Sequence, residues 1–127
     1  MLKRRFAGIK IDFPIDTQTG AASTAAVYFE LEPEQHLGRH THSAEEILLV
    51  LEGEAEAVVG DERGSLSKKE MAVVPATVPY ELYNVGEVTL QVVGFFSSAA
   101  VVAIFGDPLA PLDTKVPPVA GAPLPEA

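Results

Sequence analysis

The chain has 127 residues, 47% of them hydrophobic, which suits one domain with a buried core and argues against a disordered chain. Its 18 acidic residues outnumber 9 basic ones, and the formal net charge of −9 argues against binding to the phosphates of a nucleic acid. The absence of cysteine excludes disulfides, thiolate metal ligands and thiol catalysis.

Four of the nine basic residues fall within the first ten positions, as in the charged start of a signal peptide. The apolar run that follows, residues 6–9, is too short for a signal peptide and ends at Lys10. No apolar stretch approaches the ~20 residues that a membrane helix needs. We therefore expect a cytoplasmic protein that binds neither membrane nor nucleic acid.

Short segments rich in β-formers follow one another along the chain, separated by turn residues. Residues 23–31 predict the first strand, and residues 60–64 predict a loop because of their glycine and aspartate content. Further strands are expected at residues 47–51, 54–59, 71–74, 81–83, 88–96 and 99–105. No segment has the period of an amphipathic helix, and turns every ~8–12 residues indicate an all-β sandwich or barrel.

The last segment, residues 107–127, differs in composition because it holds six of the ten prolines and few charges. We therefore divide the chain into a β-domain, residues 1–106, and a proline-rich tail or arm, residues 107–127. Two interpretations remain open for the tail. It is a disordered or polyproline-like extension, or it is an arm that wraps the barrel or a partner subunit. The anchors of such an arm would be Leu109, Leu112 and Val116.

All three histidines fall within seven residues, at His36, His40 and His42. Residues two apart in a strand point to the same face, so His40 and His42 project together, and Glu46 joins them if the segment stays extended. Two imidazoles and one carboxylate with open positions suit a first-row divalent metal, as in non-haem iron oxygenases. The other interpretation of such a pair is histidines satisfied by ordinary hydrogen bonds.

The stretch from His40 to Gly53 resembles the first motif of the cupin superfamily, G-x5-H-x-H-x3,4-E-x6-G. His40, His42, Glu46 and Gly53 match at the family spacing, whereas Glu34 stands at the opening glycine.

A second family motif, G-x5-P-x-G-x2-H-x3-N, is expected after a short gap. Lys69 stands at its first glycine after fifteen intervening residues, and Pro75 and Asn84 match the proline and the asparagine. Thr77 replaces the inner glycine and Tyr80 the histidine that is usually the fourth metal ligand. The spacing of this motif is preserved although its residues are not.

The resemblance implies an antiparallel jelly-roll β-barrel of six to eight strands, commonly dimeric. It implies one divalent transition metal (iron, manganese, nickel, zinc or copper) on His40, His42 and Glu46. For assembly we expect a homodimer in which the N-terminal strand or the tail crosses to the partner, because a small barrel has sheet edges to protect.

Three roles are open for Tyr80. It ligates the metal as phenolate, it donates its hydroxyl to a metal-bound water or substrate as a catalytic group, or it closes a barrel that has lost its metal. His36 is either a further nitrogen ligand or an exposed histidine. Glu34, Glu45 and Glu54 are expected to be solvated charges.

Strand parity predicts that the barrel interior is apolar and that Arg39 points outward. The residues expected inside are Leu48, Val50, Ala55, Ala57, Val59, Leu90, Val92 and Phe96. Such a lining favours a small, partly apolar ligand or substrate.

The leading hypothesis is a metal-dependent enzyme with dioxygenase, isomerase or lyase chemistry. The alternatives are a non-catalytic ligand-binding, sensor or accessory protein, and a structural barrel kept for dimerisation.

Overall fold

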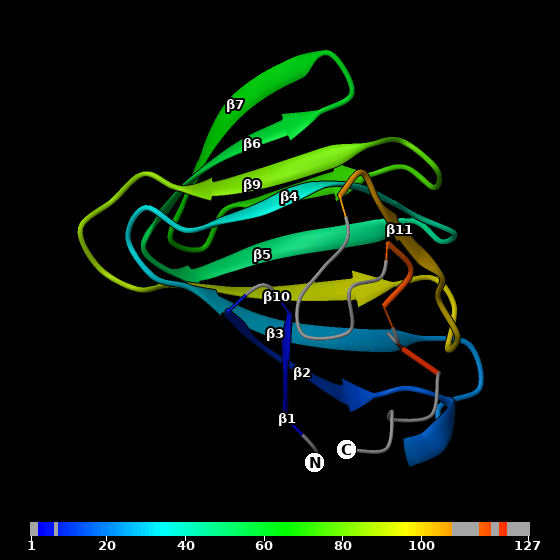
Figure 1. Ribbon diagram of the computed structural model, residues 1–127. Helices are drawn as coiled ribbons and strands as arrows, with labels where there is room; N and C mark the ends of the chain where they lie inside the picture. The colour runs from blue at the N-terminus through cyan, green and yellow to red at the C-terminus, as the bar shows by residue number, and fades with distance from the viewer. Residues whose placement is uncertain (1–2, 7, 108–114, 118–119, 122–127) are drawn as a thin grey trace.

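The computed structural model describes residues 3–6, 8–107, 115–117 and 120–121 (Figure 1). Its eleven described strands form two antiparallel sheets, which confirms the all-β jelly-roll barrel, with more strands than the six to eight expected. The first sheet has the order β1-β2-β3-β10-β5-β8, with strands Lys3–Phe6, Ile9–Ile15, Ala25–Leu31, Leu90–Phe96, Glu46–Glu52 and Met71–Val74. The second has the order β11-β4-β9-β6-β7, with strands Ala103–Phe105, His36–His42, Tyr80–Asn84, Glu54–Val59 and Glu62–Ser67. The described residues include a short 3-10 turn, Thr17–Thr19, and no helix among them is long and apolar enough to cross a membrane.

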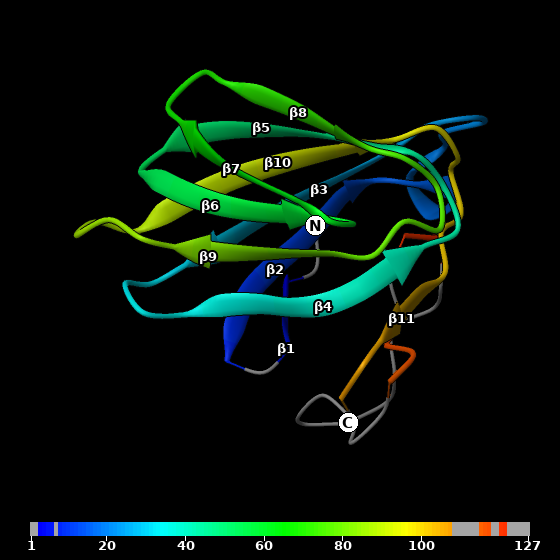
Figure 2. The same cartoon turned by 90° about the horizontal axis from the view of Figure 1, so that it is seen from above.

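The two sheets lie face to face: in Figure 2, β8, β5, β10 and β3 of the six-stranded sheet lie above β6, β9 and β4 of the five-stranded sheet. Alternate residues of each strand point between the layers and form the core, as the burial of Leu48 and Val50 on β5 shows. The other residues predicted inside are also buried, except that Val59 is half-buried. Parity along the strands therefore placed the core correctly.

The loop predicted over residues 60–64 is confirmed for its first two residues and wrong for the other three. The turn consists of Gly60 and Asp61, and β7 begins at Glu62, which pairs with Val59. The sequence of β7 is polar because most of its side chains face solvent, so its strand conformation comes from pairing with β6 rather than from its own propensity. Strand β2 was missed, and the strand predicted over residues 99–105 is confined to Ala103–Phe105.

Three non-glycine residues within the described segments have positive φ: Glu34 (72°), Lys69 (71°) and Thr77 (66°). These are the positions where the two motifs of the resemblance call for glycine. A positive φ strains an L-residue because Cβ approaches the backbone carbonyl. These turns therefore have the left-handed backbone conformation that glycine normally adopts there, which supports the placement of the second motif.

Replacing Lys69 by glycine should raise the free energy of unfolding by roughly 0.5–1 kcal/mol, because relief of the left-handed conformation exceeds the entropy that glycine adds to the unfolded chain. Lys68→Gly is the matched control: Lys68 is the adjacent lysine and has no positive φ. This control should lower stability by roughly 0.5–1 kcal/mol. Urea denaturation followed by circular dichroism measures both, and equal effects of the two substitutions would contradict the strain at Lys69.

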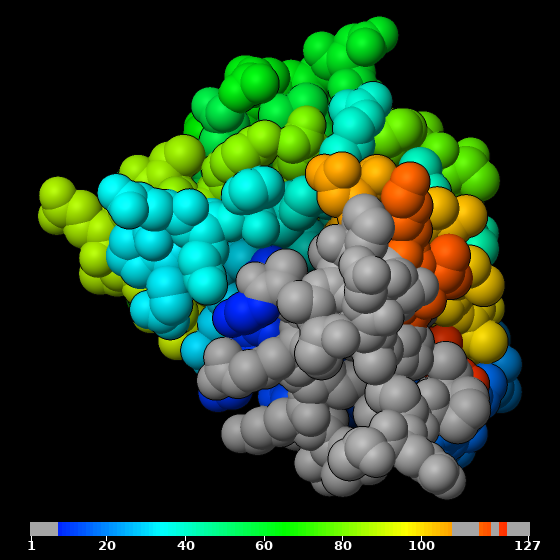
Figure 3. Space-filling model, viewed as in Figure 1, coloured from blue at the N-terminus to red at the C-terminus, as the bar shows by residue number. Residues whose placement is uncertain are grey.

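The described residues of the tail contact the barrel. The backbone N–H of Phe105 donates to the carbonyl of Lys115, that of Val101 to Ala120, and that of Gly121 to the buried carboxylate of Asp16. Figure 3 shows the described C-terminal segments, in orange to red, on the surface of the barrel. Of the predicted anchors Val116 is exposed, whereas Leu109 and Leu112 lie outside the described residues. The division of the chain at residue 106 remains a prediction.

Candidate functional site

A β-bulge in β4 selects which histidines face the interior. Leu37 pairs with Leu82 and His40 with Tyr80, so Gly38 and Arg39 together oppose one residue of β9. The extra residue reverses the alternation: His40 is buried, and His36, four residues earlier, is exposed and stacks on Tyr83 outside the barrel. His36 is therefore not part of the interior site.

The interior site brings together His40, His42, Glu46 and Tyr80 from three strands. The rings of His40 and His42 meet edge to face at 4.7 Å, and the Tyr80 ring lies 4.2 Å from that of His40. The Tyr80 hydroxyl donates a 2.6 Å hydrogen bond to Oε1 of Glu46, and His42 Nδ1 lies 3.4 Å from the same oxygen. All four residues named from the sequence thus line one site.

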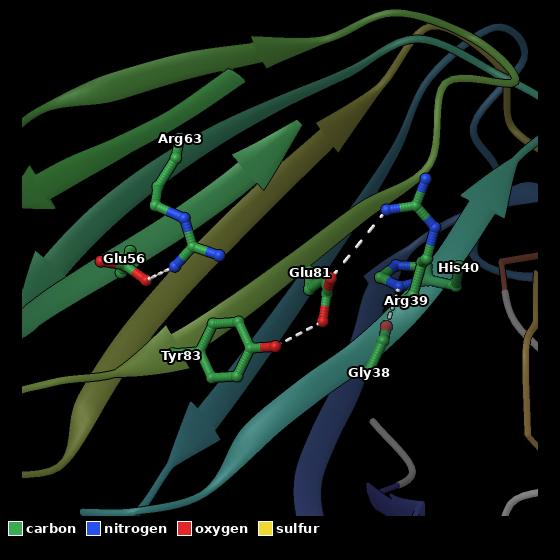
Figure 4. Close-up of polar contacts among 7 residues, drawn as sticks. All are labelled: Gly38, Arg39, His40, Glu56, Arg63, Glu81 and Tyr83. Carbon is green, nitrogen blue, oxygen red and sulfur yellow. Dashed lines mark hydrogen bonds and ion pairs between the residues drawn. The ribbon is translucent and has the colours of Figure 1, made fainter. Parts of the chain in front are cut away.

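The carbonyl of the bulge fixes the His40 ring. His40 Nδ1 lies 2.6 Å from the Gly38 carbonyl oxygen, which accepts its proton and leaves Nε2 with a free lone pair (Figure 4). Burial, and next the neighbouring His42, lower the pKa of His40 to about 3. His40 is therefore neutral at pH 7, the form in which imidazole binds metals, and a carbonyl that accepts the other ring proton in this way orients metal-ligating histidines.

Tyr80 is held as a protonated phenol. Complete burial, and next the negative charge of Glu46, raise its pKa well above the ordinary value of 10. The hydroxyl is therefore a hydrogen-bond donor whose acceptor is the Glu46 carboxylate. This contact leaves the choice among the three roles as a prediction, because a buried tyrosine bonded to Glu46 is also compatible with a residue that closes the barrel.

Gly94 on β10 makes room for the Glu46 carboxylate and was missed from the sequence. A Cβ at position 94 would lie 2.0 Å from Oε2 of Glu46 and 2.8 Å from Cγ1 of Val27. Its signal was a lone glycine inside the predicted strand 88–96, a pattern that often marks the close approach of another group.

A cavity of about 40 Å³ lies beside these groups. Its lining is otherwise apolar, with Phe96, Phe105 and Pro117 among the residues around it. The space suits one or two water-sized molecules rather than a large substrate. The sequence missed Phe105, which stacks on His40 at 4.4 Å, because its strand was misplaced.

The charged residues near the site face away from it. Arg39 is exposed and forms a 3.9 Å ion pair with Glu81, which accepts a hydrogen bond from Tyr83, on the outer face of the five-stranded sheet (Figure 4). Glu34, Glu45 and Glu54 are exposed, as predicted. None of these charged residues therefore provides a basic partner for Glu46 in the interior.

Two buried polar atoms of the site make no hydrogen bond: His42 Nδ1, which lies 3.4 Å from Oε1 of Glu46, and Glu46 Oε2. Across the described part of the chain, no three His, Asp or Glu side chains are placed so that together they could hold a metal ion. A buried carboxylate is costly unless a positive charge compensates it. Two imidazoles and a carboxylate are ligand types that a divalent metal accepts, so the chemistry of these side chains suits such an ion. The metal site itself remains a prediction.

Comparison with known families gives one match: the Cupin domain model matches residues 27–96, just over half of the chain. The matched region contains His40, His42, Glu46, Tyr80 and Gly94. A search of curated proteins gives no match.

Solved structures with the same fold include three cupin-like proteins of low sequence identity. Oxalate decarboxylase from Lactobacillus farciminis, solved as a formate complex, is 19% identical with a TM-score of 0.78, and the match covers 84% of this chain and 33% of that one. The cupin domain of Cnp3 from Schizosaccharomyces pombe is 15% identical with a TM-score of 0.67, covering 77% of this chain and 69% of that one. Salicylate 1,2-dioxygenase from Pseudoaminobacter salicylatoxidans, solved as a point mutant, is 22% identical with a TM-score of 0.62, covering 71% of this chain and 27% of that one. The chain spans about a third of the length of the decarboxylase, and at these identities the likeness establishes the fold alone.

Proposed function

The chain belongs to the cupin domain family, and from this premise we propose that it is a metal-binding small cupin that acts on a small organic molecule. His40 and His42 would hold the metal through ring nitrogens and Glu46 through its carboxylate. The observation that carries the proposal is the pair of buried polar atoms without a hydrogen bond, His42 Nδ1 and Glu46 Oε2. A cation would satisfy both at once.

When bound, a divalent metal would supply a Lewis acid for dioxygenase, isomerase or lyase chemistry. The chain's own residues prepare the site for it. The Gly38 carbonyl holds the His40 tautomer, and the Tyr80 hydroxyl holds the Glu46 carboxylate. Phe96 and Phe105 pack against the two histidines and exclude water from one side of the site.

A second candidate function is a non-catalytic cupin that binds a small ligand or the metal alone. The cavity volume of about 40 Å³ favours it, because it leaves little room for an organic substrate beside a metal. The similar structures include both enzymes and a cupin domain without a stated reaction. Cytoplasmic location remains a prediction for either function.

Metal analysis combined with an activity screen tests the proposal. The purified protein should contain a first-row transition metal, and the metal-loaded protein should consume oxygen or convert a member of a panel of small acids and diols. Metal binding without turnover would support the second candidate. Failure to bind any of the five metals during titration would contradict the proposal and leave only the metal-free form of the second candidate.

Substitutions of Tyr80 should separate its roles. Tyr80→Phe should retain the metal, because removing the hydroxyl frees Oε1 of Glu46, and should lose most of any activity. Tyr80→His should tighten metal binding by at least roughly tenfold, or about 1.4 kcal/mol, because a neutral imidazole adds a fourth ligand. Competition with a chelator, for wild type and both variants, measures these affinities.

Tyr83→Phe is the matched control, because Tyr83 also donates to a glutamate but lies on the outer face of the same strand. It should leave metal affinity and activity unchanged. If wild type and all three variants bind metal equally and Tyr80→Phe is fully active, position 80 has no role at the metal.

A further inference from the structure

The described residues of the C-terminal segment lie along the outer edge of β11, the last strand of the five-stranded sheet. The backbone N–H of Phe105 donates to the carbonyl of Lys115 at 2.6 Å, and that of Val101 donates to the carbonyl of Ala120 at 2.8 Å. The segment therefore runs antiparallel to the residues around β11. Figure 1 draws it in orange to red beside that strand. We call its described residues, 115–117 and 120–121, the strap.

The far end of the strap is fastened to the other sheet, just after β2. The backbone N–H of Gly121 donates to Oδ2 of Asp16 at 3.0 Å, while Oδ1 of the same buried carboxylate accepts from the backbone of Gln18 at 2.8 Å. Gly121 has a φ of 83°, and a Cβ there would lie 2.7 Å from Cβ of Ala100 and 3.0 Å from the carbonyl oxygen of Ala99. Glycine therefore permits this close fastening, and a larger residue would push the strap away.

The strap forms part of the wall of the interior site. Among the described residues that line the cavity beside His40, Pro117 comes from outside the eleven strands, and the others lie on β2, β3, β4, β5, β9, β10 and β11. A proline has no N–H to donate to a neighbouring strand, so at this point the wall lacks the hydrogen bond that ties a regular strand into its sheet. The strap is therefore tied less firmly than the strands that form the rest of the wall.

The site is closed to organic molecules while the strap is in place. The cavity of about 40 Å³ holds a water-sized molecule, and the His40 side chain belongs to a residue that is 2% exposed. An organic molecule that reaches His40 must therefore displace some part of the wall. Moving a strand would break a ladder of hydrogen bonds on both of its sides, whereas moving the strap breaks the bonds at its two ends and uncovers the small side chain of Ala120.

We propose that the strap is a displaceable wall of the interior site, and that its release from Asp16 and β11 opens the route by which a small, partly apolar organic molecule reaches His40. A segment with few bonds to the core can open while the core strands stay folded. The space that the strap vacates then sets the size of the ligand that the site admits. The nature of the ligand rests on the proposed function, but the opening itself requires no metal.

Chemical modification of His40 in the chelator-treated protein tests this route. Diethyl pyrocarbonate acylates neutral imidazole and is too large for a cavity of about 40 Å³, so it reaches His40 only when the wall opens. His36 is exposed on the same strand and serves as the internal standard. Trypsin cleavage after Arg39 places the two histidines in different peptides, and mass spectrometry gives the ratio of their modification rates.

Two substitutions at the fastening should release the strap. Asp16→Asn leaves one side-chain oxygen for two backbone donors, those of Gln18 and Gly121. Gly121→Ala places a Cβ against Ala100. Each should raise the rate at His40, relative to that at His36, at least roughly tenfold, because the open state becomes more populated.

Gly106→Ala is the matched control for the glycine substitution. Gly106 lies just after β11 without a positive φ, and the nearest atom to a Cβ there would be the Arg39 carbonyl oxygen at an ordinary 3.7 Å. This substitution should leave the ratio of rates unchanged. Hydrogen exchange of the β5 amides, measured on every variant, separates opening of the strap from unfolding of the barrel.

The proposal is supported if Asp16→Asn and Gly121→Ala both raise the ratio while Gly106→Ala and the protection of β5 stay as in the wild type. It is overturned if His40 of the wild type reacts as fast as His36, if neither substitution changes the ratio, or if β5 loses protection in proportion to the faster reaction. Because the protein carries no metal during this measurement, a strap that opens in a chain unable to bind metal would refute the proposed function alone. Metal binding with an unchanged ratio would refute the strap alone.

Discussion

His40→Ala and His42→Ala should each abolish metal binding by the purified protein, and Glu46→Gln should weaken it strongly. Each histidine supplies one of two imidazole ligands, and neutral His40 is already oriented by the Gly38 carbonyl, 2.6 Å from its Nδ1. The loss should also lower the melting temperature measured with metal present, because a ligand that binds the native state alone stabilises it by mass action. Elemental analysis and thermal denaturation, with and without chelator, measure both effects.

His36→Ala is the control for these substitutions. It removes an imidazole from the same strand, but His36 is exposed and stacks on Tyr83 outside the barrel. It should retain full metal content. Full occupancy in the His40→Ala/His42→Ala double variant would refute the metal site, and loss of metal in His36→Ala would place the site outside the barrel.

Gly94→Ala should lower the free energy of unfolding by about 2–4 kcal/mol. The added Cβ would lie 2.0 Å from Oε2 of Glu46 and 2.8 Å from Cγ1 of Val27, so the carboxylate must leave its hydrogen bond with Tyr80 and the neighbouring strand β3 must shift. Urea denaturation at fixed protein concentration measures the change. Circular dichroism is the suitable signal because the chain has no tryptophan.

Gly64→Ala is the matched control, because Gly64 also lies within a strand and a Cβ there would meet no atom within 4 Å. It should be neutral or slightly stabilising, since alanine reduces the entropy of the unfolded chain. If Gly94→Ala is as mild as Gly64→Ala, the Glu46 carboxylate does not occupy the space beside Gly94.

The fold was largely predictable because its central strands carry their burial pattern in the sequence. Strand β5 alternates from Glu46 to Val50 between buried positions and positions that are exposed or half-buried, and β10 does the same, so their inward residues could be named before the structure. Strand β7 could not be predicted, because its residues are polar and its conformation depends on the hydrogen bonds that β6 offers across a two-residue turn.

The sequence by itself placed His40, His42 and Glu46 on one face, because strand parity is a local property of the chain, and Tyr80 joined them only through the resemblance to the second cupin motif. Only the tertiary structure decided how these groups meet. The bulge at Gly38 and Arg39 turns His36 outward, although parity alone placed it with His40. The contacts of Glu46 with Tyr80 and of its carboxylate with Gly94 join residues 34 and 48 positions apart. Such contacts depend on which strands become neighbours and in what register, and no local pattern along the chain specifies either.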